Sequence, residues 1–137
     1  MDYACQGTTR VAVLLSSLAS GTAVYRAHFV VDTGATDCVV PASALRRAGV
    51  EPVETMTYEL ADDTLHDYDV GLVRIELMGS ITAGRVVFGA EDIEPILGVR
   101  ALESVGMIVD RVRKELRRVP AIPLRRVARR AAAVALY

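Results

Sequence analysis

The stretch "HFVVDTGATDCVVP", residues 28–41, places an aspartate between an apolar run and a turn. Val30 and Val31 are β-branched residues that favour strands, whereas the Asp-Thr-Gly triplet that follows consists of turn formers. On its own, such a triplet predicts only that Asp32 ends a strand. Its apolar flank and a second motif, "PILG" at residues 95–98, make a chance occurrence much rarer. The aspartate is therefore the first candidate for a chemical role.

The length and composition indicate one globular domain. A chain of 137 residues, 52% apolar and 24% charged, is long enough to bury a core and too apolar to be disordered. Its net charge of -1 hides an uneven distribution, because residues 1–109 carry a net charge of -8 and residues 110–137 a net charge of +7. We therefore expect an acidic body with a basic tail.

The cysteines and histidines exclude several classes of site. Cys5 and Cys38 are too few for a disulfide framework or a four-ligand zinc site, and His28 and His66 do not cluster with them. The apolar run at residues 11–19 is shorter than a membrane span and lacks the features of a signal peptide. We therefore expect reduced thiols, a cytoplasmic protein with no membrane span, and neither a metal nor another cofactor.

Hydrophobic periodicity predicts mostly strands, with turn residues between them. The predicted hairpins lie at residues 11–32, 55–79 and 66–89. Short helices are predicted at residues 41–50 and 99–105, with further strands at 107–109 and around residue 116.

The basic tail has a helical pattern after Pro123. Apolar residues share one face and four arginines share the other. We predict a domain over residues 1–120 and a basic C-terminal tail over 121–137. A solvated helix, docking onto an acidic surface and contact with nucleic acid or a membrane surface all fit the tail pattern, and the solvated helix is favoured, so no nucleic-acid partner is expected.

With these patterns in place, "VVDTGAT" and "PILG" resemble the retropepsin-like aspartic proteases, specifically the small bacterial single-domain type. The resemblance covers about residues 10–120. It implies a mainly β fold, a single-domain closed β-barrel (the acid-protease fold) with one or two short helices. It also implies a homodimer that acts on a peptide or protein substrate, because the chain has one Asp-Thr-Gly triplet and the active site is shared between two copies.

The resemblance implies a role for each residue of the loop. Asp32 would be catalytic, facing its copy across the dimer axis, and the pair would share a proton and activate water. Thr33 would form a hydrogen bond across that axis, and Thr36 would brace the outer oxygen of Asp32. Gly34 would offer its N–H to the carboxylates, and Ala35 would line the floor of the substrate groove. Three more residues, Ile96, Leu97 and Gly98, would pack behind the loop.

The hairpin at residues 58–68 would be the flap that closes over a peptide, with the tip Ala61, Asp62, Asp63 and Thr64. Relatives usually have a glycine after Ala-Asp, whereas this chain has a second aspartate. Two interpretations remain open. Both carboxylates are solvated turn residues, or one points into the groove and favours cationic peptides.

The predicted function is that of an aspartic endopeptidase. The alternative is a catalytically silent peptide-binding or scaffold module with the same fold, which would be distinguished by separated Asp32 carboxyl groups in the dimer. The sequence contains no other known catalytic motif, neither a GxSxG elbow nor an HExxH metal motif. Cys38 is interpreted as a packed core thiol and His66 as a surface residue.

Overall fold

A computed structural model describes residues 9–19 and 22–124 of the chain. The fold is mainly β, as the sequence predicts. Its larger sheet contains β1 (Arg10–Ser17), β2 (Val24–Val31), β3 (Cys38–Pro41), β4 (Glu54–Glu59), β5 (Leu65–Leu77), β6 (Ser80–Gly89) and β7 (Ile96–Leu97).

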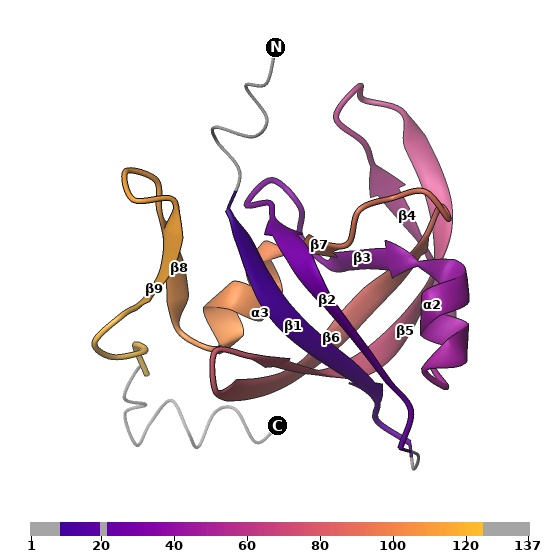
Figure 1. The fold of residues 1–137 in the computed structure, drawn as a ribbon. Coiled ribbons are helices and arrows are strands. Elements are labelled where there is room, and N and C mark those ends of the chain that lie inside the picture. Colours follow the sequence, from indigo (N-terminus) through magenta and orange to yellow (C-terminus); the bar gives the residue numbers. More distant parts are fainter. Residues whose placement is uncertain (1–8, 20–21, 125–137) are drawn as a thin grey trace, which may run out of the picture.

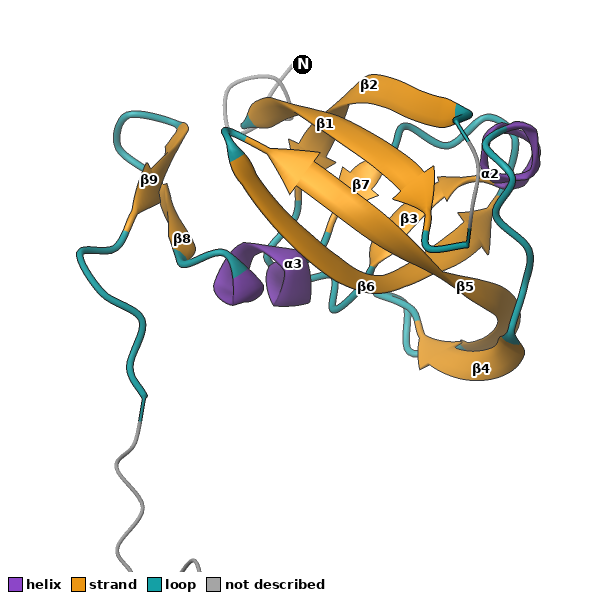
Figure 2. Ribbon diagram, turned by 90° about the horizontal axis from the view of Figure 1, so that it is seen from below, coloured by secondary structure: helices purple, strands orange, loops and turns teal. Residues whose placement is uncertain are grey.

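The strands of this sheet are paired in a ring. The order is β1-β2-β7-β3-β6-β5-β4, and β1 also pairs with β5, so the hydrogen-bonded ladder returns to its first strand. β4 lies beyond this ring and pairs antiparallel with β5. Figures 1 and 2 show the ring as a curved sheet around the core, with the β4–β5 hairpin extending from one side. This ring agrees with the barrel fold that the resemblance to the aspartic proteases implies.

The β1–β2 hairpin shows why these residues form strands. Along β1, buried and more exposed side chains alternate, and Val13 and Leu15 are 1% and 0% exposed. This period of two is what a strand with one face on the core requires. Phe29 on β2 is also fully buried, so the hairpin contributes large apolar side chains to the core.

Two short helices flank the sheet, α2 (Ala42–Arg47) and α3 (Val99–Ser104). α2 begins after Pro41, and one of its free N-terminal N–H groups, that of Ser43, is bonded by a residue far along the chain. The carboxylate of Glu91 accepts hydrogen bonds from the Ser43 N–H, at 3.0 Å, and from the Ser43 hydroxyl. These hydrogen bonds lower the pKa of Glu91. The helix ends at Arg47, and Gly49 follows its C-cap with a φ of +79°, which suits a residue without a Cβ.

A second, two-stranded sheet contains β8 (Met107–Asp110) and β9 (Glu115–Arg118). Both views show this hairpin standing to one side of the ring, joined to it through α3. Met107 and Leu116 are nevertheless buried and belong to the core cluster. The hairpin is therefore packed against the body of the domain.

The predicted hairpins, short helices and final strands are all present. The helix predicted for the basic tail lies almost entirely outside the described residues, which end at residue 124, and the division at residue 120 stays a prediction. Among the helices of the described residues, none is long and apolar enough to cross a membrane.

Candidate active site

The loop after β2 is held in place by its backbone. Val31 pairs with Leu97 in the parallel β2–β7 ladder, and the Asp32 N–H donates to the Leu97 carbonyl at 3.1 Å. The Ala35 N–H then donates back to the Asp32 carbonyl at 3.0 Å, which closes a tight turn. Asp32 is thus placed at the point where the strand turns outward from the core.

The Asp32 carboxylate is oriented by its own loop. The Gly34 N–H donates to Asp32 Oδ1 at 2.9 Å. A Cβ on Gly34 would lie 3.2 Å from that oxygen, closer than most such contacts, so glycine suits this approach. Asp32 and Thr33 are exposed in the single protomer. The hydrogen bond that the carboxylate receives within the described residues comes from Gly34, so the brace assigned to Thr36 stays a prediction.

The Ile-Leu-Gly segment lies directly behind this loop. Leu97 is fully buried, and the Val99 N–H donates to the Ala35 carbonyl at 2.8 Å. A Cβ on Gly98 would lie 2.6 Å from the carbonyl carbon and oxygen of Asp37, too close for any side chain. The absence of a side chain at this residue therefore lets α3 begin against the back of the loop.

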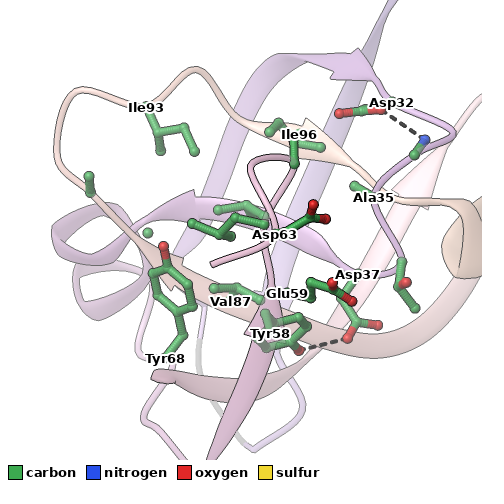
Figure 3. A pocket seen from close by; sticks show the side chains of 17 residues that line it. Asp32, Ala35, Asp37, Tyr58, Glu59, Asp63, Tyr68, Val87, Ile93 and Ile96 are labelled. Atoms are coloured by element: carbon green, nitrogen blue, oxygen red, sulfur yellow. Dashed lines mark hydrogen bonds between the residues drawn. The ribbon is translucent and has the colours of Figure 1, made fainter. Parts of the chain in front are cut away.

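Asp37 has a structural role that the sequence did not reveal. It is 6% exposed, accepts a hydrogen bond from the Tyr58 hydroxyl at 2.7 Å, and lies 3.6 Å from the Arg100 guanidinium. One carboxylate thus links the loop, strand β4 and α3. Figure 3 shows its hydrogen bond to Tyr58. A charged residue directly before the apolar run at residues 38–41 was the available signal. Its partners are too distant in sequence to be found without the fold.

The Tyr58 contact gives a testable prediction. Burial and the hydrogen bond to Asp37 raise the pKa of Tyr58 to about 12. Replacing Tyr58 with Phe keeps the ring but removes the donor, so we expect a loss of about 1–2 kcal/mol in the free energy of unfolding at neutral pH.

The same variant has a pH signature, measurable by urea denaturation. The pKa of Tyr58 is higher in the folded state than its ordinary value of 10.0. The stabilisation is therefore complete below pH 10 and is lost as the pH rises through 12. The stability difference between wild type and Tyr58→Phe should narrow over that interval. A constant difference would contradict the hydrogen bond from Tyr58 to Asp37 as the source of the stabilisation.

The tip of the β4–β5 hairpin, which the resemblance implies is the flap, is an ordered turn in which the two aspartates differ. Asp62 Oδ1 accepts hydrogen bonds from the Thr64 N–H and hydroxyl, at 3.0 and 2.6 Å, and these lower the pKa of Asp62. The Leu60 N–H donates to the Thr64 carbonyl at 2.8 Å, which closes the turn. Asp63 has φ of +67°, a conformation that favours glycine. Asp63 therefore occupies the residue position at which relatives are expected to have glycine.

A cleft of about 640 Å³ lies between the loop and the flap. Its walls are apolar at Val39, Ile93 and Ile96, and the flap contributes Asp63 and Tyr68 (Figure 3). The cleft is concave and open, with polar groups at a few points, as is usual for ligand sites.

The cleft brings together part of the predicted site. The predicted residues that line it are Asp32, Gly34, Ala35, Thr36, Ala61, Asp63 and Ile96. The predicted residues outside its lining are Thr33, Asp62, Thr64, Leu97 and Gly98. Asp62 and Thr64 lie outside the lining because they form hydrogen bonds with each other. Leu97 and Gly98 lie outside it because they are behind the loop.

The remaining reactive side chains lie elsewhere. Cys38 is 2% exposed, and burial raises the pKa of its thiol to about 11, so it is the packed core thiol that the sequence predicts. His66 is exposed, also as predicted, with its ring 6.4 Å from that of Tyr68. Across residues 9–19 and 22–124, no group of three or more His, Cys, Asp or Glu side chains could hold a metal ion.

The chain matches a protein family and resembles solved protease structures. The model of a family described as aspartyl protease matches residues 18–101. The solution structure of simian foamy virus (mac) protease is similar, with 19% sequence identity, a TM-score of 0.46 and coverage of 66% of this chain and 87% of that chain. The EIAV protease complexed with the inhibitor HBY-793 has 17% identity, a TM-score of 0.49 and coverage of 77% and 95%. No curated protein matches the chain.

The residues that match the family include the main parts of the cleft. The match covers more than half of the chain and contains the Asp32 loop, the flap hairpin and the Ile-Leu-Gly segment. The resemblance to the aspartic proteases is thereby confirmed, and the chain belongs to the aspartyl protease family.

Proposed function

We propose that the chain is an aspartic endopeptidase that works as a homodimer, with one Asp32 contributed by each protomer. The observation that carries this proposal is the Asp32 carboxylate, which is held by the Gly34 N–H at the edge of a cleft of about 640 Å³. The family match supports the same chemistry. A flap hairpin on the opposite side of the cleft supplies a surface for the backbone of a peptide.

The dimer follows from the number of catalytic carboxyl groups. Hydrolysis by carboxyl groups alone needs one as a base and one as an acid, and the chain has one Asp-Thr-Gly triplet. The Asp32–Gly34 turn is exposed in the protomer, so a second copy has access to it. The β8–β9 sheet is separate from the ring and offers strand edges for pairing between copies.

In the proposed mechanism, the two Asp32 carboxyl groups share one proton, because like charges so close do not both ionise. The ionised carboxylate takes a proton from a water molecule, and the water oxygen attacks the scissile carbonyl carbon. The protonated partner donates its proton to the carbonyl oxygen, which gives a neutral tetrahedral diol. The carboxyl group that took the water proton then donates it to the amide nitrogen, and the other carboxylate takes a proton from one hydroxyl of the diol. The C–N bond breaks to give a carboxylic acid and an amine, and the pair again shares one proton.

Thr33 gives a prediction about the dimer. Its side chain is exposed and lies outside the cleft lining, which agrees with a contact to a second copy. Thr33→Ala should raise the dimer dissociation constant about tenfold, since two symmetric hydrogen bonds of about 0.5–1.5 kcal/mol each are lost. Sedimentation equilibrium measures this constant. An unchanged dissociation constant would contradict a hydrogen bond from Thr33 across the dimer axis.

The function is tested by sedimentation equilibrium and by cleavage of a random peptide library from acidic to neutral pH, on the same sample. The expected result is a dimer that cleaves peptides and loses this activity in the Asp32→Asn variant. Glu103→Gln is a matched control, because Glu103 is an exposed acid on α3 outside the cleft.

Each alternative result has a definite meaning. A dimer without cleavage at any pH would contradict the proposed enzyme and favour a binding module. A monomer that cleaves peptides would contradict the shared site. Cleavage that survives in Asp32→Asn would show that another group, or a contaminant, carries the activity.

A further inference from the structure

We infer that the cleft selects peptides with a cationic side chain beneath the flap, and that Asp63 and Glu59 are the residues that determine this specificity. The inference rests on the proposed function, because it describes the substrate of the same cleft. It goes beyond that function by naming the charge of the substrate and the two carboxylates that recognise it.

The charge of the cleft lining is the first observation. Four of the lining residues are acidic, Asp32, Asp37, Glu59 and Asp63, and none is Lys, Arg or His. Asp37 is paired with Arg100, and Asp32 is assigned to catalysis. Two acids therefore remain to act on a ligand. Among the ion pairs of the part of the chain that the structure describes, none includes Asp63 or Glu59.

The orientation of the flap acids is the second observation. Asp62 forms the hydrogen bonds that hold the turn and does not line the cleft, whereas its neighbour Asp63 does line it. Figure 3 shows the Asp63 carboxylate directed into the cleft, between Ile96 and Ala35 in that view. Asp63 is therefore the carboxylate that points into the groove, and Asp62 is the solvated turn residue.

Glu59 extends the same surface along the flap. It lies on β4 next to Tyr58, which the bond to Asp37 holds against the loop. Figure 3 shows Glu59 on the same side of the cleft as Asp37. A peptide that lies between the loop and the flap would therefore pass two carboxylates in addition to the catalytic one.

The physical effect is selective attraction inside an existing site. A guanidinium or ammonium group near two carboxylates is attracted, and an acidic side chain in the same place is repelled. Exposed ion pairs contribute modestly, so we expect each carboxylate to change the preference for a cationic peptide about two- to fivefold. The apolar walls at Val39, Ile93 and Ile96 accept the rest of the peptide.

The test uses peptides with a non-hydrolysable centre, in which one residue at a time is either arginine or citrulline. These side chains have nearly the same shape and differ in charge, so the ratio of their dissociation constants reports electrostatic recognition. Fluorescence anisotropy measures the ratio for the wild type, Asp63→Asn, Glu59→Gln and the double variant. Asparagine tolerates positive φ, so Asp63→Asn keeps the turn conformation.

We expect the wild type to bind the arginine peptide more tightly at one or more positions beneath the flap. Each single variant should reduce this preference about two- to fivefold, and the double variant should remove most of it. Glu103→Gln removes an equal charge from the protein but not from the cleft, and should leave the ratio unchanged.

Two outcomes overturn the inference. One is equal affinity for arginine and citrulline at every position, and the other is a preference that survives in the double variant. Either result together with library cleavage would leave the proposed function intact. An arginine preference without any cleavage would support the inference and contradict the enzyme, and failure of all peptides to bind would contradict both.

Discussion

Asp32→Asn is expected to reduce peptide cleavage about 10²–10⁴-fold, which is the range that positioned acid–base groups contribute. Asparagine has nearly the same size as aspartate and can still accept the Gly34 N–H, which now lies 2.9 Å from Asp32 Oδ1. The fold and the dimer should therefore persist. What is lost is the carboxyl pair that shares and transfers a proton. Steady-state kinetics with a library-derived peptide measures the decrease.

Mixing the two proteins tests whether the site is shared. If each active site needs Asp32 from both protomers, subunit exchange with Asp32→Asn converts wild-type dimers into inactive mixed dimers. Activity per wild-type chain then falls in proportion to the wild-type fraction. Unchanged activity per wild-type chain, after exchange is shown to be complete, would contradict the shared site.

The second large effect is expected for Gly98→Ala. The new Cβ would lie 2.6 Å from the backbone of Asp37 and 2.8 Å from the carbonyl oxygen of Thr36. Backbone atoms of a hydrogen-bonded loop move less readily than a flexible side chain, so either the loop or α3 must shift. We expect a loss of about 1–3 kcal/mol in the free energy of unfolding, together with weaker catalysis.

Gly84→Ala is the matched control for this variant. A Cβ on Gly84 would meet Ile75 Cδ1 at 3.9 Å, an ordinary contact, and Gly84 lies within the β5–β6 ladder opposite Val73. Denaturant unfolding should separate the two variants clearly. Equal stability losses would show that the close approach at Gly98 is not the cause.

Much of the fold was predictable because its signals are local. The alternating apolar residues around Val13 and Leu15 indicate a strand, and Gly49 and Gly106 mark the ends of short helices. Their effects act over a few residues, so a single sequence contains them. β7 was not predicted as a strand, because Ile96 and Leu97 are too few to show a period.

The contacts that position the site were less predictable. Asp37 meets Tyr58 and Arg100, and Glu91 meets Ser43, across long separations in the sequence. Neither acid belongs to a recognisable motif, and the fold, not the local sequence, brings each acid to its partners. The triplet at Asp32 was found because its chemistry requires neighbouring residues of fixed type.

The location of β4 outside the strand ring has a consequence for how the protein evolves and moves. Lifting this strand disrupts its ladder with β5 and the Tyr58–Asp37 bond, but it breaks none of the pairings that close the ring. In the proposed enzyme, opening this hairpin to admit a substrate would therefore cost less free energy than unfolding the domain. In the proposed enzyme, changes at the exposed residues of this strand, unlike changes at Tyr58, would alter the rate of opening and the choice of substrate at little cost to the stability of the domain.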